Sequence, residues 1–147
     1  MTQGEDARPA ATAPSEPDLQ LQLSCAVTAR PAEMRAVRNQ LRGLLQQWQL
    51  ETRLANAVLD VAHELLVNAH QHGSPQVRLT VQTGTNEIRI DVHDGSDAPA
   101  RLLPYRPGVS EHGLGLQLVR QLSTQWGQTT DDDGKSVWAV FARRQPR

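Results

Sequence analysis

The chain has 147 residues, of which 38% are hydrophobic, and a formal net charge of -1. This size is enough for one domain to bury a core without disulfides. Lys135 is the single lysine and the arginines are scattered, so no basic track predicts direct binding to a nucleic acid. Cys25 has no second cysteine to pair with, which excludes an internal disulfide and fits a reducing interior. With neither a signal peptide nor an apolar run of transmembrane length, the chain is predicted to be soluble and cytoplasmic, without contact with a membrane.

The composition of the chain changes at about residue 18. Residues 1–18 are rich in Pro, Ala, Thr and acidic residues without periodicity, which predicts a disordered leader. Residues 19–147 are predicted to form a single domain. This domain begins with a half-buried strand, because apolar and polar residues alternate strictly. The apolar positions of the strand are Leu19, Leu21, Leu23 and Cys25.

Two amphipathic helices are predicted next. Pro31 stands where a helix would begin, and apolar residues recur at helical spacing as far as Trp48. A second helix is predicted from about Thr52 to His72, with Gly73 as its C-terminal cap. The residues predicted to face inward from the second helix are Leu54, Val58, Val61, Leu65 and Ala69.

The second half of the chain is predicted to contain two pairs of strands separated by a helix. Residues 77–92 alternate on both sides of a turn at residues 83–86, which is typical of a β-hairpin. Residues 94–110 form a long loop, of a length found in functional lids. Apolar residues that extend to Trp126 indicate a third helix, and two strands follow around an acidic turn at residues 131–134. This order predicts an α+β fold, a two-layer α/β sandwich with helices on one face of a mixed, mostly antiparallel sheet.

A polar stripe on the second predicted helix is the first candidate for a functional site. Glu64, Asn68 and His72 are spaced so that they lie on nearly one face of the helix, beside apolar residues. Such a stripe requires a polar partner, which can be water, a metal or a ligand. Taken alone, it fits a solvated helix face better than a site.

Two further features follow along the chain. Asp94 stands at the end of a predicted strand, and Gly113 and Gly115 open the third helix, where backbone N–H groups can bind an anion. Each feature alone has a simpler explanation, as a turn residue or as loop glycines. Together, a carboxylate on a helix, an aspartate at a strand end and glycines before a helix can surround one ligand, and they indicate a nucleotide site.

These segments resemble the nucleotide-binding motifs of the Bergerat-fold ATPases, the superfamily of gyrase and histidine kinases. Residues 64–73 resemble the N box, residues 92–95 the first glycine box and residues 111–116 the second glycine box. Within that superfamily the chain is similar to the small anti-sigma-factor serine/threonine kinases of bacteria, through the end of the N box, the Trp-Gly pair at residues 126–127 and residues 134–138. The resemblance covers roughly residues 20–142.

The resemblance implies ATP and Mg²⁺ as cofactors and a role for each motif. Glu64 would act as the general base toward an attacking hydroxyl, and Asn68 would hold Mg²⁺. Asp94, followed by Gly95, would accept a hydrogen bond from the adenine amino group. The residues implied to contact the phosphates through backbone N–H groups are Gly113, Leu114 and Gly115.

Two more residues are implied to contact the nucleotide, and two positions depart from the family pattern. His72 would approach the phosphates, and Ser136 would help Asp94 to hold the adenine. Ser96 and Ala98 stand where the first glycine box usually has glycines. A side chain there restricts the backbone, which bears on how well the site holds a nucleotide.

The function that the resemblance implies is that of an ATP-dependent serine/threonine kinase, which would bind a sigma factor and phosphorylate a small antagonist protein. Ser96 and Ala98 keep a second hypothesis open, in which the same fold is a catalytically weak or inactive partner-switching module. A third hypothesis is the ATP-binding half of a split histidine kinase. The resemblance also implies a homodimer, because kinases of that branch commonly pair through the first strand and helix. The strand at residues 19–27 would serve as the edge that pairs with a second copy.

Overall fold

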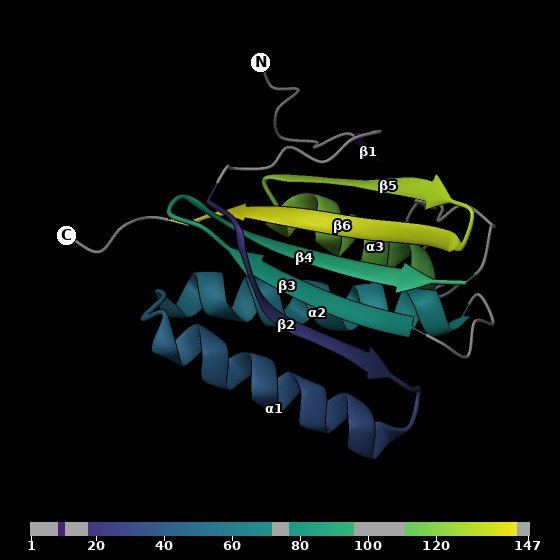
Figure 1. Ribbon diagram of the computed structural model, residues 1–147, viewed down its shortest axis with the longest axis horizontal. Coiled ribbons are helices and arrows are strands. Elements are labelled where there is room, and N and C mark those ends of the chain that lie inside the picture. The colour runs from purple at the N-terminus through teal and green to yellow at the C-terminus, as the bar shows by residue number, and fades with distance from the viewer. Residues whose placement is uncertain (1–8, 11–17, 72–76, 96–110, 144–147) are drawn as a thin grey trace.

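The computed structural model describes residues 9–10, 18–71, 77–95 and 111–143, and for residues 9–10 and 111–116 it describes the backbone alone. Three helices and six strands make up this part of the chain (Figure 1). In chain order they are β1 (Pro9–Ala10), β2 (Gln20–Val27), α1 (Pro31–Gln47), α2 (Thr52–Gln71), β3 (Val77–Thr83), β4 (Glu87–Asp94), α3 (Glu111–Leu122), β5 (Gln125–Asp131) and β6 (Gly134–Ala142). None of these helices is both long enough and apolar enough to cross a lipid bilayer.

The strands form one sheet, in the order β1-β5-β6-β4-β3-β2. Every neighbouring pair is antiparallel except β1 with β5, which is parallel. The three helices lie together on one side of the sheet (Figure 1). The α+β class, and the mixed, mostly antiparallel sheet with helices on one face, are therefore confirmed.

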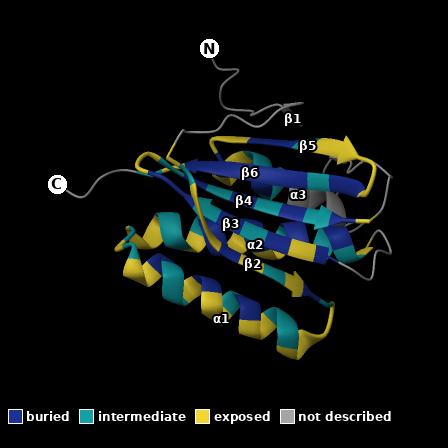
Figure 2. Cartoon of the chain, in the orientation of Figure 1, coloured by how far each residue is buried: buried dark blue, intermediate teal, exposed yellow. Residues whose placement is uncertain are grey.

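The core lies between the sheet and the helices (Figure 2). Strands β3 and β4 send alternate residues into it, because successive side chains of a strand point to opposite faces. Helix α2 has no glycine or proline, and its apolar residues recur at helical spacing, so one face packs on the sheet. The inward residues predicted for this helix are all in the core or packed against it, and Val58 and Val61 are fully buried.

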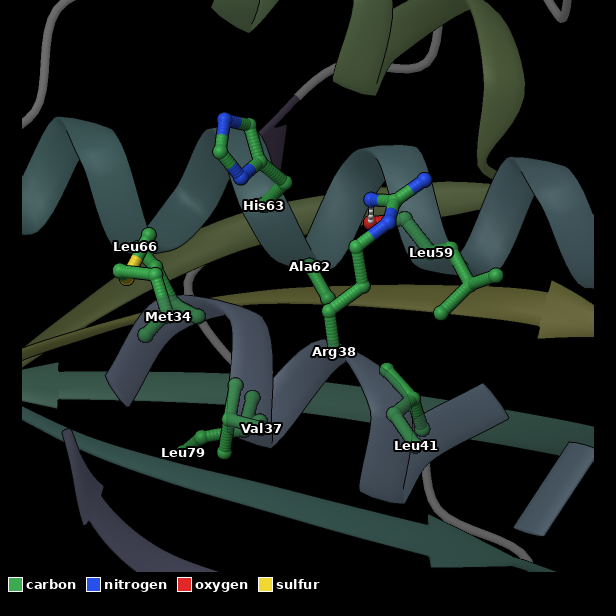
Figure 3. A pocket seen from close by; sticks show the side chains of 9 residues that line it. All are labelled: Met34, Val37, Arg38, Leu41, Leu59, Ala62, His63, Leu66 and Leu79. Carbon is green, nitrogen blue, oxygen red and sulfur yellow. Dashed lines mark hydrogen bonds between the residues drawn. The ribbon is translucent and has the colours of Figure 1, made fainter. Parts of the chain in front are cut away.

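Helices α1 and α2 pack through an apolar seam with one arginine across it (Figure 3). Arg38 of α1 donates a hydrogen bond from Nη1 to the carbonyl oxygen of Leu59 at 3.5 Å, and its Nη2 lies 3.6 Å from the carboxylate of Asp60. Both charged side chains are partly exposed, so the ion pair contributes about 1 kcal/mol at most. The apolar contacts of the seam therefore account for most of the packing between the two helices.

One apolar residue of the first predicted strand faces solvent. Leu21 is 59% exposed, whereas Leu23 is 8% exposed. Leu21 lies opposite Gln82 of β3, but Leu23 lies opposite Val81, so Gln22 is an extra residue in the pairing. Such a β-bulge turns the preceding side chains to the other face of the sheet. The alternation of apolar and polar residues correctly predicted the strand. The bulge could not be predicted from the same pattern, because it depends on the pairing with β3.

The third helix is shorter than predicted. Helix α3 ends at Leu122, and Trp126 belongs to β5, where it is 2% exposed. The hydroxyl of Ser123 donates a hydrogen bond to the carbonyl oxygen of Val119 at 2.6 Å, and the backbone N–H of Thr124 already bonds to β6. The helical spacing of apolar residues therefore extends past Leu122 in the sequence, although the backbone from Thr124 onward pairs with β6 instead.

The predicted leader contains two residues of the sheet. Pro9 and Ala10 pair with Trp126 and Gly127 of β5. Asp18, at the end of the predicted leader, accepts hydrogen bonds from the backbone N–H and the hydroxyl of Thr85, at 2.9 and 2.5 Å. Residues 1–8 and 11–17 lie outside the described residues, so their disorder stays a prediction.

The turn between β5 and β6 brings the first residue of β6 against the end of β4. Gly134 has a φ of 139°, a conformation that residues with a side chain rarely adopt. A Cβ atom at Gly134 would collide with the carbonyl oxygen of Asp94 and would lie 2.8 Å from the Cα of Gly95. The backbone approach at this corner of the sheet therefore requires glycine.

We expect Gly134→Ala to lower the free energy of unfolding by about 2–4 kcal/mol, because both the φ angle and the backbone contact oppose a methyl group. Gly43→Ala is the matched control. Gly43 lies within α1 and nothing is within 4 Å of an added Cβ, so this change is expected to stabilise the protein by about 0.5–1 kcal/mol. Urea denaturation of both variants measures the difference, and equal stabilities would contradict the close approach at Gly134.

Candidate functional site

The elements that carry the predicted site residues meet at one end of the molecule, on the right in Figure 1. The C-terminal end of α2, the end of β4, the start of β6 and the beginning of α3 all lie there. Helix α2 packs on α3, β4 and β6. Residues from distant parts of the sequence are thus gathered on the helix-covered side of the sheet.

Helix α2 presents Glu64 and Asn68 one turn apart, and both are partly buried. The Nδ2 atom of Asn68 is buried, and among the residues that the structure describes no group accepts a hydrogen bond from it. A buried amide without a partner costs about 1–3 kcal/mol, so it requires an explanation. A carboxamide in this condition fits a site that receives a polar ligand.

Asp94 and Lys135 form a buried ion pair at the end of the sheet. Asp94 is the last residue of β4, Lys135 stands directly opposite on β6, and each is 1% exposed. The Nζ atom of Lys135 lies 3.9 Å from Oδ2 of Asp94. Buried charges are tolerated only with partners, and here each charge stabilises the other.

His70 of α2 belongs to this site although the polar stripe did not predict it. Burial lowers the pKa of His70, and the negative charge of Asp94 raises it part of the way back, so the ring lies within electrostatic range of that carboxylate. The Nε2 atom is buried, and no described residue hydrogen-bonds with it. His70 lies two residues after Asn68 and therefore off the face that carries Glu64, which is why the spacing missed it.

Ser136, which was predicted to help Asp94 to hold the adenine, does not lie beside Asp94. Ser136 stands opposite His93, and its hydroxyl hydrogen-bonds with the side chain of Asp91. Because successive residues of a strand point to opposite faces, Lys135 and not Ser136 is the residue of β6 next to Asp94. Residues 137–141 are all apolar and all buried, so the local pattern of β6 carried no signal that distinguishes Lys135 from Ser136.

The helix-free face carries a separate polar group around Asp91. Burial raises the pKa of Asp91, while the Arg89 guanidinium and the Ser136 hydroxyl lower it part of the way back. Arg89 also lies over the ring of Trp138, 5.4 Å from its centroid. This group points away from α2 and is not part of the candidate site.

The first turn of α3 carries the glycines predicted to bind the phosphates. Gly113 and Leu114 lie in this turn, and Gly115 is the fifth residue of the helix. The first four backbone N–H groups of a helix have no acceptor within it, and its N-terminus carries partial positive charge, so phosphate is favoured there. Gly95 follows Asp94 and is exposed. His72 and the loop of residues 96–110 lie outside the described residues.

The donor set is suited to a metal that arrives with a nucleotide. Within the described ranges, no group of three or more His, Cys, Asp or Glu side chains is placed to hold a metal ion. Mg²⁺ usually keeps several waters and is held by one or two protein oxygens together with the phosphates of a substrate. A single carboxamide oxygen from Asn68 fits this manner of binding.

Comparisons with known proteins bear on the family and the fold. Residues 27–141 match the family described as the histidine kinase-like ATPase domain. No curated protein matches the chain. Among solved structures, the chain is similar to the crystal structure of the RsbU and RsbW domains of Rv1364c from Mycobacterium tuberculosis, with a TM-score of 0.59 and 18% identity over 85% of this chain and 33% of that chain.

The structural likeness concerns the fold, and this chain spans about a third of the length of that protein. The family match covers most of the chain and includes α2, β4, α3 and nearly all of β6. The protein therefore belongs to the histidine kinase-like ATPase domain family.

Proposed function

We propose that the protein is an ATP- and Mg²⁺-dependent serine/threonine kinase of the anti-sigma-factor type, which binds a sigma factor and phosphorylates an antagonist protein. The observation that carries the proposal is the meeting of Asp94 with the α2 helix that bears Glu64 and Asn68, in a chain of the ATPase family. The resemblance of its motifs to anti-sigma-factor kinases supports the finer assignment, as does the fold shared with the RsbU and RsbW domains of Rv1364c. A cytoplasmic location remains part of the proposal.

Different residues bind the base and the phosphates, at the two ends of the site. Asp94 accepts a hydrogen bond from the amino group of adenine at the sheet end, and Gly95 stands next to it in the chain. The backbone N–H groups at the start of α3, at Gly113 and Leu114, receive the phosphates. Asn68 would coordinate Mg²⁺ through its carboxamide oxygen, and the ion would neutralise phosphate charge.

Glu64 is the proposed general base. It precedes Asn68 by one helical turn on the same face, so its Cα lies about 6 Å nearer the N-terminus of the helix than that of Asn68. A serine or threonine hydroxyl would pass its proton to Glu64 as its oxygen attacks the γ-phosphorus of ATP, and the bond to the leaving ADP would break. The helix holds both residues in a fixed relative position, which favours this alignment.

We expect Glu64→Gln to lower the rate of phosphate transfer by about 10²- to 10⁴-fold, because the amide cannot accept the proton of the attacking hydroxyl. Binding of ATP should change little. Asp60→Asn is the matched control, since Asp60 lies one turn earlier on α2 and is exposed. Transfer of the γ-phosphate of ATP to a candidate antagonist protein measures the rates. A Glu64→Gln variant that transfers phosphate as fast as the wild type would show that the assigned base is wrong.

We expect Asn68→Ala to abolish the rise in melting temperature that Mg-ATP produces, while the nucleotide-free protein melts no lower than the wild type. The reason is that the buried amide nitrogen has no acceptor among the described residues, so its removal costs little without ligand. Thermal melts with and without Mg-ATP measure both effects. A lower melting temperature without nucleotide would instead indicate a structural role for Asn68.

The second candidate function is a binding module whose nucleotide site is weak or vestigial. It is favoured by the burial of Asp94 and Lys135, which are each 1% exposed. A base must displace the groups that cover the carboxylate of Asp94 before it can bind there. A wild-type protein that neither binds Mg-ATP in calorimetry nor melts higher in its presence would favour this function over the kinase.

The proposed homodimer would form through β2, which is an edge strand of the sheet. We expect Leu21→Lys to shift the protein from dimer to monomer in light scattering at micromolar concentration, since a charge on an edge strand opposes pairing with a second copy. Leu21 is 59% exposed on that strand. Leu122→Lys is the matched control, because Leu122 is also an exposed large apolar residue, at 37%, but lies at the end of α3. A wild-type monomer, or equal effects of both changes, would contradict the proposed interface.

A further inference from the structure

The one lysine of the chain is buried against the residue proposed to recognise adenine. We propose that Lys135 is a specificity-determining residue of the nucleotide site, whose ammonium group donates a hydrogen bond to ring nitrogen N1 of adenine while Asp94 accepts one from the 6-amino group. This inference rests on the proposed binding of ATP and goes beyond it, since it assigns the reading of the base to a pair of side chains.

The backbone determines where Lys135 points. Strands β4 and β6 pair so that Asp94 and Lys135 are directly opposite, and directly opposite residues project from the same face of a sheet. Gly134 allows β6 to begin in contact with the backbone of Asp94 and Gly95. The Lys135 ammonium is thereby held 3.9 Å from the carboxylate, on the side of the sheet that α2 covers.

The choice of lysine at this position has a physical cost. Of the chain's 15 basic residues other than histidine, this is the one that is not arginine, and it is 1% exposed. Removing an ammonium group from water is strongly unfavourable, and an ion pair offsets this penalty only with good geometry. Replacing such a pair by apolar residues is often neutral or stabilising, so a functional role accounts for its presence better than stability does.

The pair matches the hydrogen-bonding edge of adenine. A donor and an acceptor stand side by side, and adenine presents an acceptor, N1, beside a donor, the 6-amino group. Guanine presents the reverse order, with an acceptor at position 6 and a donor at position 1. In a buried site guanine would place its acceptor against the carboxylate of Asp94 and its donor against the ammonium group of Lys135. This mismatch strongly lowers the affinity for guanine nucleotides.

The experiment compares four nucleotides in calorimetry with Mg²⁺. They are ATP, 1-deaza-ATP, in which C–H replaces N1, 7-deaza-ATP as the control that alters another ring atom, and GTP as the base with the reversed pattern. We expect the wild-type protein to bind 1-deaza-ATP about 10- to 100-fold more weakly than ATP, and 7-deaza-ATP within about 3-fold of ATP. Lys135→Met retains a long side chain without the charge and should bind ATP and 1-deaza-ATP equally. Arg78→Met removes a cation from the exposed side of β3 and should keep the wild-type preference.

Each outcome decides the inference. Equal affinity of the wild type for ATP and 1-deaza-ATP overturns the role of Lys135 but leaves the proposed kinase intact. Undetectable binding of every adenine nucleotide overturns both. GTP that binds as tightly as ATP overturns the assigned polarity of the pair. Because the comparison of nucleotides is made first on the unchanged chain, it remains decisive where Lys135→Met fails to fold.

Discussion

The packing of α2 against the sheet is the contact on which both the fold and the site depend. Its inward residues Val58, Val61 and Leu65 are at most 1% exposed and contribute the central part of the core. Burial of apolar area is the dominant favourable term in folding, so this face sets the rotation of the helix about its axis. Once that rotation is set, Glu64 and Asn68 have no freedom to move away from the end of the sheet. The apolar face thus positions polar groups that contribute nothing to the core themselves.

The same end of the sheet concentrates features that a fold optimised for stability would avoid. The Asn68 amide nitrogen and His70 Nε2 are buried without a hydrogen-bond partner among the described residues. Asp94 and Lys135 are two buried charges. Gly134 has low strand propensity, but it allows the close contact between the backbones of β4 and β6. Natural proteins violate such local rules mainly at functional sites.

Local pattern predicted the elements whose apolar faces are decided within the element itself. Helix α2 and the β3–β4 hairpin lie where periodicity of 3.6 and of 2 placed them. The failures came where a partner strand overrides that periodicity. Leu21 faces solvent because β2 has a bulge in its pairing with β3. Trp126 lies in a strand and not in the predicted helix, because the chain from Thr124 onward makes backbone hydrogen bonds with β6. Neither effect is visible in the segment that it changes.

For the site, the sequence by itself determined which chemical groups are available and which of them share an element. Glu64 and Asn68 had to lie on one helix face, because helical spacing leaves no alternative. Only the tertiary structure decided that Lys135, and not Ser136, stands beside Asp94 and that His70 lies within range of that carboxylate. The physical reason is that contacts between elements depend on strand register and on how α2 is rotated over the sheet. Both are set by the burial of apolar surface over the whole core, and the residues of a single motif do not determine that total.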